Sequence, residues 1–185
     1  MDIFSHGLWA AAAYKAADGK KRFNLWKAAF WGVFPDLFAF TISFLWLFSN
    51  FVLGNLSFAD LPRPDEIEPA SDALMFGDGD IGKATSFIAR VTAILYHLSH
   101  SAVVFLVIFG LVYLIFRRPI WELGGWLMHI FLDIPTHQYQ VYPTPVLWPL
   151  SGWKFDGFSW ETLWFLVPNY IAIIFVYLLL RNKRG

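Results

Sequence analysis

Long apolar runs alternate with short polar segments along this chain. Three runs reach the roughly 20 residues that an α-helix needs to cross a bilayer, at residues 28–48, 91–116 and 162–180. Two other apolar segments, residues 3–14 and 123–134, are shorter, and the second spans a membrane only with its polar flanks included. The pattern predicts an all-α, integral membrane helical bundle, a single domain over residues 1–185, with four spanning helices plus a short N-terminal helix.

Composition supports a membrane protein. The 185 residues are 57% hydrophobic, 20% aromatic and only 15% charged, whereas a soluble domain is about 25% charged. The formal net charge is zero, so nothing suggests a nucleic-acid partner. Cysteine is absent, which excludes disulfides, thiolate metal ligands and a cysteine nucleophile.

Basic residues predict the orientation of the chain, because cytoplasmic loops of membrane proteins are enriched in Lys and Arg. They gather in three places: Lys20, Lys21, Arg22 and Lys27; Arg117 and Arg118; and Arg181, Lys183 and Arg184. The loop at 51–85 is acidic instead, and the loop at 141–160 is rich in proline and aromatic residues. We therefore expect a multi-pass protein of the inner (plasma) membrane, with a cytoplasmic C-terminus and with both of these loops outside.

Polar residues inside the apolar segments are the main clue to function. All five histidines lie in or beside such segments: His6, His97, His100, His129 and His137. Two carboxylates, Asp36 and Asp133, join them. A charged carboxylate at the bilayer centre costs about 2.5–3.5 kcal/mol on insertion scales. A bound cation would offset that cost.

Spacing and depth predict that several of these side chains meet. His129, Asp133 and His137 follow one another at intervals of four, and residues four apart share a helix face. A helix rises about 1.5 Å per residue, so the distance of each residue from the cytoplasmic end of its helix can be estimated. Five residues reach a similar height, between the bilayer midplane and the outer leaflet: His6, Asp36, His100, His129 and Asp133.

Simpler interpretations exist for each residue alone. A single histidine in a helix is usually a hydrogen-bonded core residue, and His97 can line a polar helix contact. Asp36 follows Pro35 and can be the N-cap of a helix that restarts there. The coincidence of all five histidines with both acids favours a metal site.

The motifs also resemble a known family. They are "SHGLWAAAAYK", "WGVFPDLF", "YHLSHSAVVF", and "HIFLDIPTH" followed by "TPVLWPLS". These resemble the YdjM-type inner-membrane proteins, which are described as membrane-bound metal-dependent hydrolases. The ligand order is also remotely similar to that of zinc-dependent phospholipase C and P1-type nucleases. The resemblance implies metal ligation by His6, Asp36, His100, His129 and Asp133, with Asp133 able to bridge two ions.

Two positions depart from the family pattern. A second acid is common two residues after the Asp of the P-D motif, where this chain has Phe38. A His-Arg pair is common farther upstream of S-H-S, whereas here His97 lies three residues before His100. The number of ions, one or two, and the role of His97 therefore stay open.

The ligand set predicts a chemistry. Nitrogen and oxygen donors without sulfur suit Zn²⁺ first, and also Mn²⁺ or Fe²⁺. We expect hydrolysis of a phosphoester of a membrane lipid by metal-activated water, with Asp133 and His137 as catalytic residues. His137 could serve as an acid for the leaving oxygen, as a ligand of a further ion, or as a group that supports a ligand. Arg90 could hold a phosphate, or could be an interfacial arginine that extends to the headgroups.

Two other classes of function compete with this one. One is a non-enzymatic membrane protein with a structural or transported metal ion. An intramembrane metalloprotease is disfavoured, because the chain has no H-E-x-x-H motif. The substrate and the oligomeric state are not readable from the sequence.

Overall fold

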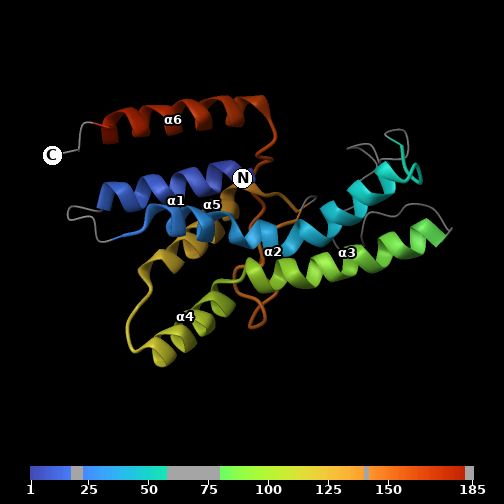
Figure 1. The fold of residues 1–185 in the computed structure, drawn as a ribbon, viewed down its shortest axis with the longest axis horizontal. Coiled ribbons are helices and arrows are strands. Elements are labelled where there is room, and N and C mark those ends of the chain that lie inside the picture. The colour runs from blue at the N-terminus through green and yellow to red at the C-terminus, as the bar shows by residue number, and fades with distance from the viewer. Residues whose placement is uncertain (18–22, 58–79, 140–141, 182–185) are drawn as a thin grey trace.

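The computed structural model describes residues 1–185 apart from 18–22, 58–79, 140–141 and 182–185, and apart from the side chains of 80–86. The described part is helical, without strands. Its helices are α1 (Ile3–Ala17), α2 (Leu25–Val52), α3 (Asp80–Ser99), α4 (Ala102–Phe116), the short 3-10 helix η2 (Trp121–Leu123), α5 (Gly124–Thr136) and α6 (Leu163–Arg181) (Figure 1). Most of the acidic loop lies outside the described residues.

Small residues bring α1, α2 and α5 into close contact. A Cβ atom at Gly125 on α5 would clash with the carbonyl oxygen of Ala28 and lie 3.0 Å from the backbone nitrogen of Gly32, both on α2. A Cβ at Gly32 would lie 2.8 Å from the carbonyl oxygen of His6 on α1. Close approach at small residues is typical of helices packed in membranes. It places the polar side chains of the three helices around one point.

An aromatic core holds α4 against α5. Its buried members are Phe105, Leu123, Trp126, Ile130 and Val146. Trp126 packs edge-on against Phe105 on α4, with ring centroids 5.5 Å apart. Its indole nitrogen donates to the carbonyl oxygen of Ser99 at 2.5 Å, and so it also anchors the end of α3.

The outer faces of the helices are apolar. On α6 the exposed side chains include Leu163, Trp164, Val167, Ile171, Ile174, Phe175, Leu178 and Leu179, and on α4 they include Leu106, Leu111, Ile115 and Phe116. Ile115 is 72% exposed and Leu163 is 77% exposed, whereas several histidines are almost fully buried. Such an arrangement suits lipid outside and a polar centre inside.

The expected number of membrane spans is supported only in part. Among the described residues, α2 and α6 are long and apolar enough to cross a membrane. The run at 91–116, expected as one helix, is instead α3 and α4, bent by 63° at a break, and the pair makes a third span if it counts as one. The segment expected at 123–134 forms α5, whose 13 residues extend only about 20 Å, short of the roughly 30 Å of a hydrocarbon core.

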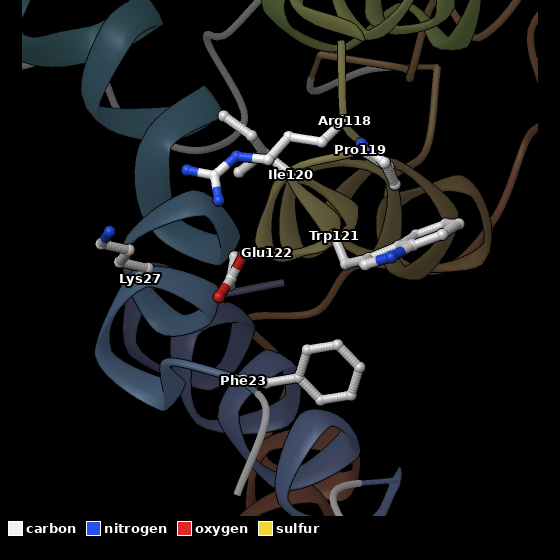
Figure 2. Close-up of a pocket in the computed structure, with 7 residues that line it drawn as sticks. All are labelled: Phe23, Lys27, Arg118, Pro119, Ile120, Trp121 and Glu122. Atoms are coloured by element: carbon white, nitrogen blue, oxygen red, sulfur yellow. The ribbon is translucent and has the colours of Figure 1, made fainter. Parts of the chain in front are cut away.

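Figure 1 shows α6 alongside α1, and α3 alongside the second half of α2. A separate cavity of about 520 Å³ lies where α2 begins and where α4 leads into η2 (Figure 2). Its walls are formed by Phe23 and Lys27 and by the segment 118–122.

Candidate metal centre

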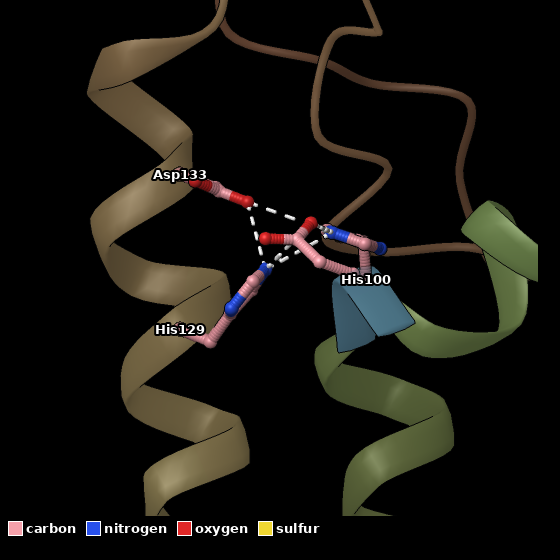
Figure 3. Close-up of side chains that lie close together, drawn as sticks. His100, His129 and Asp133 are labelled. Atoms are coloured by element: carbon pink, nitrogen blue, oxygen red, sulfur yellow. Dashed lines mark hydrogen bonds and ion pairs between the residues drawn. The ribbon is translucent and has the colours of Figure 1, made fainter. Parts of the chain in front are cut away.

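Four buried side chains from three parts of the chain meet at one point. Asp36 comes from α2, His100 from the break between α3 and α4, and His129 and Asp133 from successive turns of α5. One nitrogen or carboxylate oxygen from each lies within 4.8 Å of the others. Figure 3 shows the rings of His100 and His129 and the carboxylate of Asp133 directed toward a shared space. The arrangement can hold a divalent metal ion.

The spacing of these atoms matches that of ligands around a tetrahedral ion. With metal–ligand bonds of about 2.0–2.1 Å, neighbouring ligand atoms of a tetrahedral zinc site are about 3.3 Å apart. His129 Nε2 lies 3.0 Å from Asp133 Oδ2 and 3.6 Å from Asp36 Oδ1. His100 Nε2 lies 3.5 Å from Asp133 Oδ2 and 3.4 Å from Asp36 Oδ1. The four-residue set therefore fits a small divalent cation.

The outer nitrogens of both histidines orient their inner ones. His129 Nδ1 donates to the carbonyl oxygen of Gly32 at 2.7 Å. His100 Nδ1 lies 3.2 Å from the carbonyl oxygen of Tyr96 and 2.9 Å from Ser99 Oγ. Since a carbonyl only accepts, the Nδ1 atom of His129 carries the hydrogen, and the same tautomer suits His100. Neutral rings then present unprotonated Nε2 atoms to the centre, as metal-bound histidines do.

Two such Nε2 atoms lie only 3.1 Å apart. In the neutral rings each would present a lone pair to the other, so a positive charge is needed between or beside them. Buried polar atoms without a hydrogen bond also support binding of a cation. They are both ring nitrogens of His6, Oδ2 of Asp36 and Oδ2 of Asp133, with Thr144 Oγ1 as a fifth. Buried polar atoms are rarely left unpaired, and four of these five belong to the residues expected to bind metal.

His6 adds a second side to the cluster. Its ring stacks on that of His129 with centroids 3.6 Å apart, and its Nε2 lies 2.9 Å from Asp133 Oδ1. The N-terminal amine of Met1 donates to the same oxygen at 2.5 Å and to Thr136 Oγ1 at 3.0 Å. Asp133 thus directs Oδ2 to His100 and His129, and Oδ1 to a separate group of nitrogens. A carboxylate placed between two groups in this way could bridge two ions once the Met1 ammonium moves away.

His137 lies at the rim. Its Nδ1 is 3.4 Å from Asp133 Oδ1, and its side chain is 11% exposed, against 0–1% for the other histidines and Asp133 in the cluster. Burial lowers the pKa of His137 to about 4, although the Asp133 carboxylate acts in the opposite direction. The ring is therefore neutral at pH 7 in the metal-free site and can act as a ligand or accept a proton.

The break at His100 is stabilised by hydrogen bonds to the loop that follows α5. Ser101 is the N-cap of α4, where its hydroxyl accepts from the Val104 N–H at 3.2 Å and donates to the carbonyl oxygen of Trp148. The Ala102 N–H donates to the carbonyl oxygen of Val146 at 2.9 Å. The loop after α5 therefore satisfies backbone groups that a continuous helix would have paired internally, and the bend turns His100 inward.

Asp36 does not cap a helix. Pro35 and Asp36 lie inside α2, which continues through both. Proline lacks the N–H that would bond to Trp31, so it weakens one turn of the helix, but the buried Asp36 side chain is directed to His100 and His129 instead of to a helix end. The N-cap interpretation of Asp36 is wrong.

Two other candidates lie apart from the cluster. His97 Nδ1 donates to the carbonyl oxygen of Ala93 at 2.7 Å, and its ring packs against Trp148. Arg90 is exposed on α3. The sequence alone did not identify the carbonyl of Gly32, since a backbone acceptor has no side-chain signal. It also did not identify the ring of Tyr96, which stacks on that of His100 with centroids 3.8 Å apart.

Comparison of the chain with family models, with curated proteins and with solved structures gives no match. The functional argument therefore rests on the residues and their geometry.

Proposed function

We propose that this chain is a metal-dependent hydrolase of the membrane that cleaves a phosphoester of a lipid. The observation that carries the proposal is the buried cluster of Asp36, His100, His129 and Asp133, enclosed by helices whose outer faces are apolar. The motif resemblance to the YdjM-type family is consistent with it. We further propose four spanning segments in the inner membrane, with the C-terminus cytoplasmic.

The donor set favours a hydrolytic metal. Imidazole nitrogens with carboxylate oxygens suit Zn²⁺, and also Mn²⁺ or Fe²⁺. Because four protein donors fill a tetrahedral zinc site, activation of water in this scheme requires a fifth coordination position or a second ion. His6 and His137 beside Asp133 Oδ1 are the residues that would hold a second ion. A divalent metal supplies polarisation of a phosphoryl oxygen and activation of water at neutral pH.

The chain's own residues have distinct roles in this scheme. Asp133 contacts His100 and His129 through Oδ2, and His6 and His137 through Oδ1. The Gly32 carbonyl orients His129, and Ser99 with Tyr96 orients His100. His137 is the most exposed side chain of the cluster, which suits acceptance of a proton from water and its transfer to the leaving oxygen of a substrate.

The setting of the cluster supports the proposal of a lipid substrate. It lies among apolar helices, and the loop at 142–162 that follows α5 presents exposed Leu147, Leu150, Trp153 and Phe155. Aromatic and aliphatic side chains at this density are typical of the membrane interface. A lipid headgroup reaches such a site more readily than a soluble polymer does.

The test combines metal analysis with a hydrolysis screen. Purified protein should contain a divalent metal and should cleave at least one class among phospholipids, lipid phosphates and prenyl pyrophosphates. Chelation should abolish turnover, and the same metal should restore it. His137→Ala should lower the rate more than the metal content. If metal-loaded protein cleaves none of these substrates, and metal removal only unfolds it, the metal is structural and the enzyme proposal fails.

A further inference from the structure

A second site lies at the opposite end of α5 from the metal cluster. The cavity of about 520 Å³ borders η2, and Asp133 lies nine residues along α5 from Gly124, or roughly 14 Å at the helical rise. Its volume falls in the range of about 300–1,000 Å³ that is usual for ligand pockets. The residues that form it have no part in the metal cluster.

The cavity lies where apolar helices end. The candidate span α2 begins at Leu25, next to Phe23 and Lys27 of the cavity wall, and α4 ends at Phe116, just before Arg118. Trp26 and Trp121 are both exposed at this level, and tryptophan is enriched where lipid headgroups meet the hydrocarbon. These features fit a position at the level of lipid headgroups.

Two cations, Lys27 and Arg118, line the cavity. Lys27 and Arg118 are exposed, and neither forms an ion pair within the described part of the chain. Figure 2 shows the guanidinium of Arg118 above the Glu122 carboxylate, with Lys27 on the neighbouring turn of α2. Two free cations at headgroup level suit a phosphate group, for which the arginine fork is well shaped.

Glu122 distinguishes this cavity from a purely cationic pocket. Its Oε1 accepts from the Asn24 N–H at 3.1 Å, so the carboxylate is held in place. Trp121 beside it offers an exposed aromatic face, and such a face attracts an ammonium group. The lining thus carries both a phosphate-binding and an ammonium-binding part.

We propose that this cavity binds the headgroup of a zwitterionic phospholipid, with a phosphate and a primary ammonium as in phosphatidylethanolamine. Lys27 and Arg118 bind the phosphate, and Glu122 with Trp121 binds the ammonium. An anionic headgroup without the ammonium, such as that of phosphatidylglycerol, leaves Glu122 unpaired next to its phosphate. This site is independent of the proposed hydrolysis at the metal cluster.

The test measures lipid binding to the full-length protein by native mass spectrometry from nanodiscs with equal phosphatidylethanolamine and phosphatidylglycerol. The wild type should retain phosphatidylethanolamine in preference to phosphatidylglycerol. The double variant Lys27→Gln, Arg118→Gln should lose binding of the retained lipid by at least about tenfold, as loss of a hydrogen bond to a charged group predicts. Glu122→Gln should remove the preference while keeping phosphate binding, and its amide oxygen can still accept from Asn24. Lys154→Gln, in the loop after α5, is the matched control and should behave like the wild type.

Three results would overturn the proposal: equal or stronger binding of phosphatidylglycerol by the wild type, unchanged binding in the double variant, or unchanged preference in Glu122→Gln. Soluble phosphoethanolamine that competes as tightly as the lipid would overturn the assignment to a lipid and leave a soluble phosphate ligand. Thermal unfolding in detergent, measured on the same samples, shows that each variant is folded.

Discussion

His129 Nε2 lies 3.0 Å from Asp133 Oδ2, one turn away on the same helix, yet Asp133 Oδ2 forms no hydrogen bond. The ring hydrogen of His129 is used on its far side, at the carbonyl of Gly32. Both atoms therefore present lone pairs to a shared space. This relationship is expected of two ligands of one cation and not of an ordinary ion pair.

Replacing the central carboxylate should remove the metal. Asp133→Asn keeps the size of the side chain but removes its charge and one acceptor oxygen, so metal affinity should fall by more than about 100-fold, beyond the 10–100-fold typical of outer-shell changes. Elemental analysis of the purified protein measures this. Asp156→Asn is the control, because Asp156 accepts from the Tyr139 N–H in an exposed loop and should leave the metal content unchanged. Retention of full metal content in Asp133→Asn would contradict the assignment.

Replacement of His97 and replacement of His100 should have different effects on metal binding, although the two residues are only three positions apart. His100→Ala removes a nitrogen from the cluster and should abolish metal binding, whereas His97→Ala loses a bond to the Ala93 carbonyl and a contact with Trp148 and should keep it. Metal titration of both variants at equal protein concentration measures this difference. Equal metal loss in both would show that the bend, and not His100 itself, is what matters.

Close packing between α2 and α5 should be required for the cluster. Gly125→Ala forces a Cβ against Ala28 and Gly32, which should cost about 1–3 kcal/mol of stability and should separate His129 from Asp36, with lower metal occupancy. Gly110→Ala on α4 meets nothing within 4 Å and should be neutral or slightly stabilising. Thermal unfolding in detergent, with and without chelator, compares the two. A Gly125→Ala protein as stable and metal-rich as Gly110→Ala would show that the helices can separate freely.

The proposed topology is testable with single cysteines, since the chain has none of its own. Cysteines at Ser71, outside the described residues, and at Ser151 should react with an impermeant maleimide added to intact cells. A cysteine at Lys183 should react only after the membrane is opened. Protection of Ser151 with labelling of Ser71 would mean that one span fewer, or one more, separates the two loops.

The helices could be predicted from the sequence because apolar runs and their polar flanks report burial in lipid directly. The segments at 28–48, 123–134 and 162–180 became α2, α5 and α6 with small shifts of their ends. The break in the run at 91–116 could not be predicted, because no proline or glycine marks it. Its only local signal is Ser101, and the bonds that stabilise it come from Val146 and Trp148, which are far away in the sequence.

Only part of the candidate cluster could be predicted from residue spacing. Spacing along one helix placed His129 and Asp133 together, since both lie on α5. Spacing failed for His97 and His100, which would share a face only if α3 continued, and α3 ends at Ser99. The acceptors that orient the rings, at Gly32 and Tyr96, are backbone atoms that any residue type would supply.

The break between α3 and α4 also has a consequence for biosynthesis. The groups freed at Ser101 and Ala102 are paired by residues that the ribosome adds more than 40 residues later, and Trp148 follows Ser101 by 47 positions. Until that loop emerges, a nascent chain has no means of holding His100 in its inward position. We therefore expect the proposed metal to bind only after α5 and the loop that follows it have been translated, and a chain truncated before Thr144 should lack it.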